Sequence, residues 1–178
     1  LAKDAKQIEN SNEHDTDGIL PQGSYVIGSI ISSFSLLETC VNDVFHQSVS
    51  GEYKYLTEDV TDRLYNVENK KGIRWRSFGV LNKYQFILSV TDRTPFDTGE
   101  LPYQNVKLVK ELRNNLVHHK PEWQTVRPVG GEYTDDSEQF LGGKLNNKFE
   151  KNPFATDAFV FFPYRCLSFG CAKWALVC

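Results

Sequence analysis

The sequence predicts an all-α protein, an up-and-down bundle of five to seven helices. Two observations support this fold class. Apolar residues recur with helical spacing over several long segments, and no alternating strand pattern of useful length occurs apart from the short stretch 158–162. With 178 residues, 40% hydrophobic and 13% aromatic, the chain also has enough apolar surface to form a folded core.

Three helices are expected in the first half of the chain. Residues 1–20 are polar, with a helix-compatible composition that breaks at Asp17-Gly18, so a single domain is expected over residues 21–178. The longest helix is predicted over residues 24–49, where one apolar stripe contains Ile27, Ile31, Phe34, Val41 and Phe45. Shorter helices are predicted over residues 56–69 and 75–90, followed by a turn-rich loop over residues 94–102.

The second half contributes three further helices. The first covers residues 103–119 and ends at Lys120-Pro121, because a residue before proline leaves the helical region. A loop with proline and glycine is expected over residues 124–136, and a helix over residues 137–150. The last helix is predicted to begin at Pro163, with Gly170 allowing close helix packing.

The composition narrows the function classes. A net charge of −3 and a pI near 5.8 argue against a general nucleic-acid coat, so any nucleic-acid contact must be local or built with a partner. The four cysteines lack metal-type spacing and are expected as buried free thiols, and we expect no metal and no cofactor. Without an unbroken apolar run or an export signal, a cytoplasmic protein is expected, although the lack of methionine suggests a trimmed chain.

Two charged residues lie on apolar helix faces. Arg113 falls among valines on the helix over residues 103–119, and Glu38 lies in the apolar stripe of the 24–49 helix, one turn before Asn42. A guanidinium cannot lose its charge, so a buried one needs a carboxylate or an anionic ligand. The simplest hypothesis is that Glu38 and Arg113 pair. A pair that only fixes helix register, a neutral Glu38 and a partner from another chain remain open.

A histidine near the end of the same helix completes the candidate site. His118 lies on the face opposite the apolar one, where the helix dipole favours an imidazolium and suits a general acid near neutral pH. Asn114, one turn earlier, can hold the imidazole ring or contact a ligand, and His119 points to the edge of the apolar face. By itself, a His-His pair at a helix end is more often structural than catalytic.

The hexamer Arg113-Asn114-Asn115-Leu116-Val117-His118 resembles the signature of HEPN (higher eukaryotes and prokaryotes nucleotide-binding) domains: arginine, a polar residue, three variable positions and histidine. The wider string over residues 112–123 is similar to that of bacterial HEPN-like proteins. Supporting segments lie at residues 37–42 and 167–174, so that the likeness spans most of residues 24–177.

This resemblance implies a helical bundle that forms a homodimer, in which two Arg-x4-His motifs share one cleft. It implies a metal-independent endoribonuclease, acting as a toxin or anti-phage effector, that leaves 2′,3′-cyclic phosphate ends. His118 would be the acid/base group and Arg113 would stabilise the phosphorane charge, with Asn114 orienting the site. Lys110 and Lys120 would form a small positive rim for RNA. An antitoxin or other regulatory protein is a further expected partner.

Two other hypotheses remain beside this one. The domain is either a catalytically inactive HEPN domain that binds nucleotide, RNA or a protein partner, or a purely structural helical module. Exposure distinguishes them: a nuclease needs Arg113 and His118 in one cleft, whereas a buried arginine and a splayed histidine favour a structural role.

Overall fold

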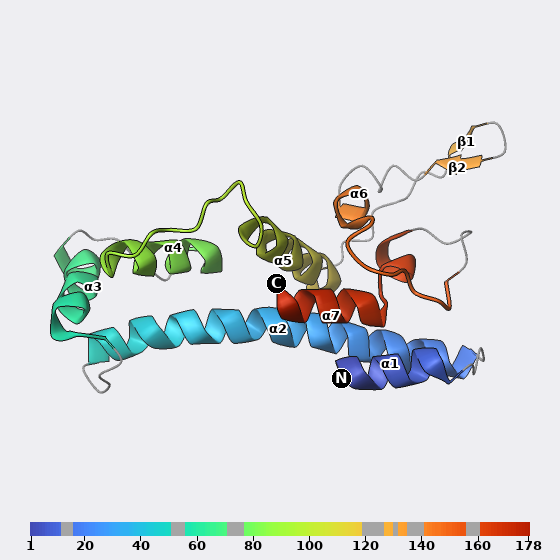
Figure 1. The fold of residues 1–178 in the computed structure, drawn as a ribbon, viewed down its shortest axis with the longest axis horizontal. Coiled ribbons are helices and arrows are strands. Elements are labelled where there is room, and N and C mark those ends of the chain that lie inside the picture. The colour runs from blue at the N-terminus through green and yellow to red at the C-terminus, as the bar shows by residue number, and fades with distance from the viewer. Residues whose placement is uncertain are drawn as a thin grey trace. The chain divides into compact units, whose positions relative to one another are not determined.

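The computed structural model describes residues 1–11, 16–50, 56–70, 77–118, 127–129, 132–134, 141–155 and 161–178. It confirms the predicted all-α helical bundle class. The α-helices are α1 (Ala2–Asn10), α2 (Thr16–Ser50), α3 (Glu58–Lys70), α4 (Val80–Val90), α5 (Tyr103–Val117), α6 (Leu141–Leu145) and α7 (Phe169–Val177), with a π-helical turn, η3 (Phe161–Arg165), before the last (Figure 1). Two short strands, β1 (Arg127–Val129) and β2 (Glu132–Thr134), pair antiparallel.

These elements form two compact units. The first contains residues 1–34 and 104–178, and the second contains residues 35–103, so α2 contributes to both. The polar N-terminal segment supplies α1 to the first unit. The expected single domain over residues 21–178 stays a prediction.

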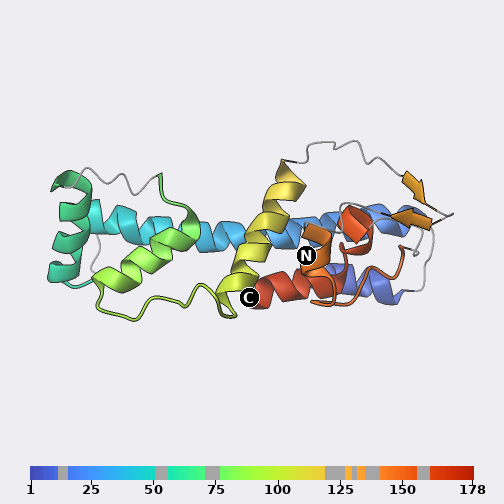
Figure 2. The same cartoon turned by 90° about the horizontal axis from the view of Figure 1, so that it is seen from above.

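The core of the first unit forms where α1, the first part of α2 and α7 run side by side, with α5 crossing α2 obliquely (Figure 2). Its buried apolar side chains come from every one of these helices and from the segment before α7. They include Ala5, Val26, Ile30, Phe34, Val109, Leu112, Leu145, Phe161, Cys166 and Cys171. Burial of this apolar surface is the main stabilising term of the unit.

A polar contact ties three helices of this unit together. Glu9 Oε1 on α1 accepts a hydrogen bond of 2.6 Å from Gln22 Nε2 on α2 and another of 2.6 Å from the Phe169 backbone N–H, at the start of α7. Gln22 is fully buried, and its amide also donates to the Leu167 carbonyl at 2.9 Å. The carboxylate thus accepts a hydrogen bond from a helix N-terminus and another from the N–H group of a buried amide.

The second unit packs the C-terminal part of α2 with α3 and α4. Phe45 and Phe86 stack with ring centroids 6.0 Å apart, and Tyr84 donates from its hydroxyl to the Leu37 carbonyl at 2.9 Å. On the surface, Arg63 of α3 pairs with Asp92, just after α4, at 3.0 Å. The Arg63–Asp92 pair holds the turn at residues 91–92 against α3. Within this turn Asp92 has a positive φ of 55°.

Helix α2 begins earlier than predicted. It starts at Thr16 and contains Pro21, so the expected break at Asp17-Gly18 is wrong. Phe34, Val41 and Phe45 are buried as expected, but nearer the N-terminus the buried positions are Val26 and Ile30, one residue before the predicted ones. The fully buried Gln22 explains this shift, because it places a polar residue in the stripe, which hydrophobicity alone does not reveal.

The last helix also begins elsewhere. It starts at Phe169, because Ser168 is its N-cap and accepts a hydrogen bond of 3.0 Å from the Cys171 N–H, so the predicted start at Pro163 is wrong. Gly170 allows a close approach, but to the non-helical backbone at Glu150 and not to another helix as predicted. A Cβ there would lie 3.0 Å from the Glu150 backbone nitrogen and 3.1 Å from its oxygen.

Two other expectations need correction. The loop expected over residues 124–136 contains the β1–β2 pair, in which Arg127 faces Thr134. The helix expected over residues 137–150 is short within its described part, since α6 covers Leu141–Leu145 and a positive φ of 65° at Asn147 follows it. Residues 103–117 are helical as predicted, and residues 94–102 form the expected loop, with its turns at residues 98–102.

The segment Pro21–Gln47 of α2 is long and apolar enough to cross a membrane by length and composition. Its mean hydropathy is 1.4, and 28% of its apolar stretch is buried. The sequence predicts no unbroken apolar run, because serines and Gly28 interrupt this stretch, but these residues lower its mean hydropathy only slightly. Core helices of soluble proteins and signal sequences meet the same criterion, so one such helix is weak support for a membrane protein. The expected cytoplasmic location stays a prediction.

Candidate functional site

The candidate site lies on α5, and the face of this helix that carries its apolar residues is buried. Val109 and Leu112 are almost completely buried and anchor the helix to the first unit. The last turn closes with a backbone hydrogen bond of 2.8 Å from the His118 N–H to the Asn114 carbonyl. The motif Arg113 to His118 therefore occupies the final helical turns and the residue that follows them.

Arg113 is half-buried, in agreement with its predicted place on the apolar side. Its Nη1 donates to Asn114 Oδ1 at 3.0 Å. Its Nε is buried and has no hydrogen-bond partner among the residues that the structure describes. A buried N–H group without an acceptor costs about 1–3 kcal/mol. This edge of the guanidinium therefore suits an anionic oxygen as a hydrogen-bond acceptor.

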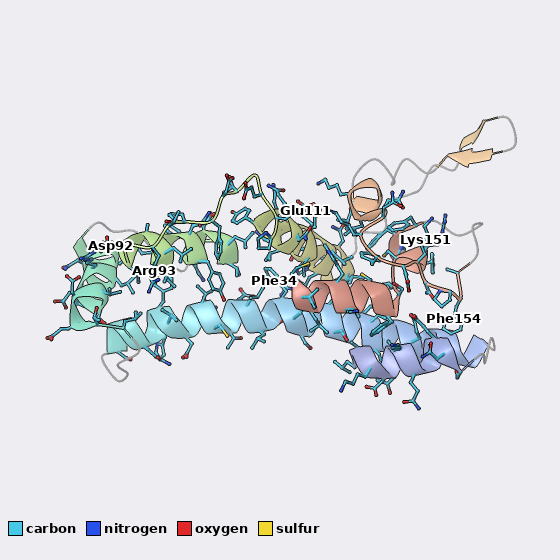
Figure 3. The ribbon with its side chains drawn as sticks, viewed as in Figure 1. Phe34, Asp92, Arg93, Glu111, Lys151 and Phe154 are labelled. Carbon is cyan, nitrogen blue, oxygen red and sulfur yellow. The ribbon has the colours of Figure 1, made fainter. Side chains whose placement is uncertain are left out.

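An aromatic ring lies beneath the arginine. The Arg113 Cζ lies 5.9 Å from the ring centroid of Phe34, a residue of α2 that is only 3% exposed. Figure 3 shows the labelled Phe34 on α2, near the crossing with α5. The ring stabilises the cation through its quadrupole, but it carries no opposite charge and offers no lone pair to Nε. The arginine therefore remains a net positive centre in a half-buried place.

His118 differs from Arg113 in its surroundings. It is exposed at the C-terminal end of α5, and its imidazole makes no hydrogen bond or ion pair with the rest of the described chain. At about 100° per residue, five positions separate the two side chains by about 140° around the helix axis. One copy of α5 therefore does not direct both groups at the same point.

The other predicted site residues are only partly brought together. Glu38 and Asn42 belong to the second unit, so the Glu38–Arg113 pair stays a prediction. Asn42 accepts a hydrogen bond of 2.6 Å from Lys83 Nζ on α4. Lys110 is half-buried on α5, and His119 and Lys120 lie outside the described residues.

Sequence reasoning missed three residues near these positions. Phe34 was assigned only to the core, and nothing in its helical spacing marks it as the neighbour of Arg113. Lys83 is 5% exposed, and its place among the apolar residues of α4 was a signal that could have been used. Lys144 of α6 pairs with Glu111 of α5 at 3.0 Å, a contact between distant segments that no local pattern reveals.

The cysteines differ from one another in burial. Cys166 and Cys171 are buried as expected, and burial raises the pKa of the Cys166 thiol to about 12. Cys40 is exposed, so the expectation of burial is wrong for this thiol. Within the described ranges, no group of three or more His, Cys, Asp or Glu side chains is placed to hold a metal ion. A surface cavity of about 430 Å³ lies along α1, away from the motif residues.

The chain was compared with protein-family models, with curated proteins and with solved structures, and none of the three comparisons finds a match.

Proposed function

We propose that this protein is a metal-independent endoribonuclease of the HEPN class. The observation that carries the proposal is Arg113, a half-buried guanidinium whose buried Nε–H has no acceptor within the described part of the chain. Such a group has both the charge and the free donor that a phosphate oxygen needs. The exposed imidazole of His118 follows on the same helix, five residues later.

The proposed reaction is transfer of the RNA phosphodiester to its own ribose. The 2′-oxygen attacks phosphorus and loses its proton, the bond to the 5′-oxygen breaks, and the leaving oxygen gains a proton. The products are a 2′,3′-cyclic phosphate and a 5′-hydroxyl end. His118 supplies the proton transfer, and Arg113 stabilises the charge on the phosphorane oxygens. Asn114, which already accepts from Arg113, keeps one edge of the guanidinium in place.

A homodimer resolves the angular separation of the two side chains. Because about 140° separates Arg113 and His118 around one α5 helix, a two-fold axis beside α5 would let the arginine of one copy face the histidine of the other. Val117, between them in sequence, is apolar and 45% exposed, which suits such a seam. The acidic net charge of −3 makes local positive groups such as Lys110 important for RNA binding.

The test is cleavage of mixed RNAs by the purified full chain in EDTA, with the ends mapped. We expect cyclic-phosphate ends from the wild type and a loss of at least about a hundredfold in rate for Arg113→Ala and for His118→Ala. Arg93→Ala and His46→Ala are matched controls, because both residues are exposed and lie in the second unit. Both should cleave as the wild type does.

A folded, dimeric wild type that leaves every RNA intact would contradict the proposal. It would favour a second candidate, an inactive domain that binds nucleotide, RNA or a protein partner. One observation favours that candidate: no described side chain orients the imidazole of His118, whereas a general base is usually held by a hydrogen bond. A toxin or anti-phage role, and control by an antitoxin, are parts of the nuclease proposal, and expression toxicity dependent on Arg113 would test them.

A further inference from the structure

We infer that Phe34 is a positioning residue for the phosphate-binding guanidinium of Arg113. The inference rests on the proposed role of Arg113 and adds a residue from α2, outside the motif. Its basis is the contact of 5.9 Å between the Arg113 Cζ and the centroid of the Phe34 ring, within one compact unit. A separation below about 6 Å is the range in which a cation over an aromatic face is stabilised.

The burial of Phe34 makes it a fixed platform. The ring is 3% exposed and belongs to the same core as Ile30 and Leu112, both fully buried. A ring buried to this extent keeps its rotamer, so it offers the guanidinium an aromatic face in a fixed position. An arginine side chain otherwise has several rotatable bonds and loses binding free energy when a ligand orders it.

The protein uses only some of the hydrogen-bond donors of Arg113 and leaves others for a ligand. Asn114 Oδ1 occupies one Nη1 donor, and Phe34 supports the guanidinium without using any donor. The buried Nε–H stays without an acceptor among the described residues. A carboxylate in place of the ring would have neutralised the charge and competed with a phosphate. The Phe34 ring orders the guanidinium of Arg113 without neutralising its positive charge, which remains available to a phosphate.

The test reduces the negative charge on the face of the Phe34 ring and leaves the shape of the ring almost unchanged. Fluorinated phenylalanines with one, two and three fluorine atoms are incorporated at position 34 of the full chain, because fluorine withdraws charge from the ring face. The probe is inorganic phosphate, followed through the Arg113 Nε–H signal in nitrogen-15 NMR, which Arg113→Lys identifies by its loss. The same fluorinated residues at Phe45, a buried aromatic of the second unit, are the control.

We expect phosphate to shift the Arg113 signal in the wild type. Affinity should fall stepwise with each added fluorine at position 34, and Phe34→Leu should weaken it by roughly three- to thirtyfold, the range that a cation–π contact allows. Fluorination at Phe45 should have no effect. A purely structural role for Phe34 would give equal affinities throughout the fluorinated series, because those rings fill the same space.

Equal phosphate affinity across the fluorinated series, an equal loss at both positions, or a wild-type signal that phosphate does not move would each overturn the inference. If Phe34→Leu does not fold, the fluorinated proteins still decide the question. RNA cleavage is measured separately. If phosphate affinity depends on fluorination but no RNA is cleaved, the nuclease proposal is refuted and the positioning role of Phe34 stands. If RNA is cleaved but phosphate affinity does not depend on fluorination, the positioning role is refuted and the nuclease proposal stands.

Discussion

Removing the Glu9 carboxylate should loosen α1 and α7 together. The residue accepts two hydrogen bonds of 2.6 Å, one from Gln22 and one from the Phe169 N–H, and both partners belong to other helices. Hydrogen bonds to a charged group contribute about 1.5–3 kcal/mol each. Glu9 is half-exposed, which weakens both through solvent screening, and alanine has a slightly higher helix propensity. Glu9→Ala should therefore lower the free energy of unfolding by about 2–4 kcal/mol.

Urea denaturation followed by circular dichroism measures this change. Glu9→Gln should lose only about 1 kcal/mol, because its amide oxygen still accepts a hydrogen bond while the charge is gone. Glu58→Ala is the matched control, since Glu58 is an exposed glutamate in the first turn of α3 and should change stability by less than about 1 kcal/mol. If Glu9→Ala unfolds at the same urea concentration as Glu58→Ala, the proposed contribution of this contact is refuted.

Three further predictions concern the C-terminal segment and the thiols. Gly170→Ala should destabilise the protein by about 1–3 kcal/mol in the same urea assay, because the new methyl would lie 3.0 Å from the rigid Glu150 backbone; unchanged stability would show that the backbone gives way. In the native state Cys40 should react with iodoacetamide much faster than Cys166, as peptide mapping by mass spectrometry can show; equal rates would contradict the burial of Cys166. The pKa of Cys166 is raised from 9.0 to about 12 by burial, so the stability gained from its neutral form is complete below pH 9 and is lost as the pH rises toward 12. The wild type should therefore lose more stability than Cys166→Ala over this interval, and parallel unfolding curves would refute the assignment.

Periodicity was the most reliable source of prediction for this fold. The helix over residues 103–117 and the buried positions Phe34, Val41 and Phe45 follow from the spacing of apolar residues. The same reasoning failed at Gln22, where the structure buries a polar side chain whose Nε2 donates to Glu9 and to the Leu167 carbonyl. Those partners lie 13 and 145 residues away, and no local pattern encodes them.

The candidate site also combines features that local residue spacing predicts with contacts that it does not predict. The place of Arg113 on the apolar side follows from α5 alone, and the structure finds it half-buried. Its neighbour Phe34 comes from another helix, so only tertiary packing reveals the contact. Asn42 was predicted to support the motif, and its observed partner is Lys83, in the same unit. Residue spacing thus identifies which side chains are unusual, while the choice of partner depends on how distant segments pack.

The first unit combines two segments that are far apart in the sequence, and this affects the order in which the protein can fold during synthesis. The Glu9–Phe169 hydrogen bond links residues 160 positions apart, and residues 35–103 separate the two halves of that unit. Because loop closure over such distances opposes folding, native pairing of α1 and α2 with α7 must wait until α7 has left the ribosome. Until then the apolar face of α2 lacks its native contacts with α7, and transiently exposed apolar surface of this kind makes a nascent chain prone to aggregation.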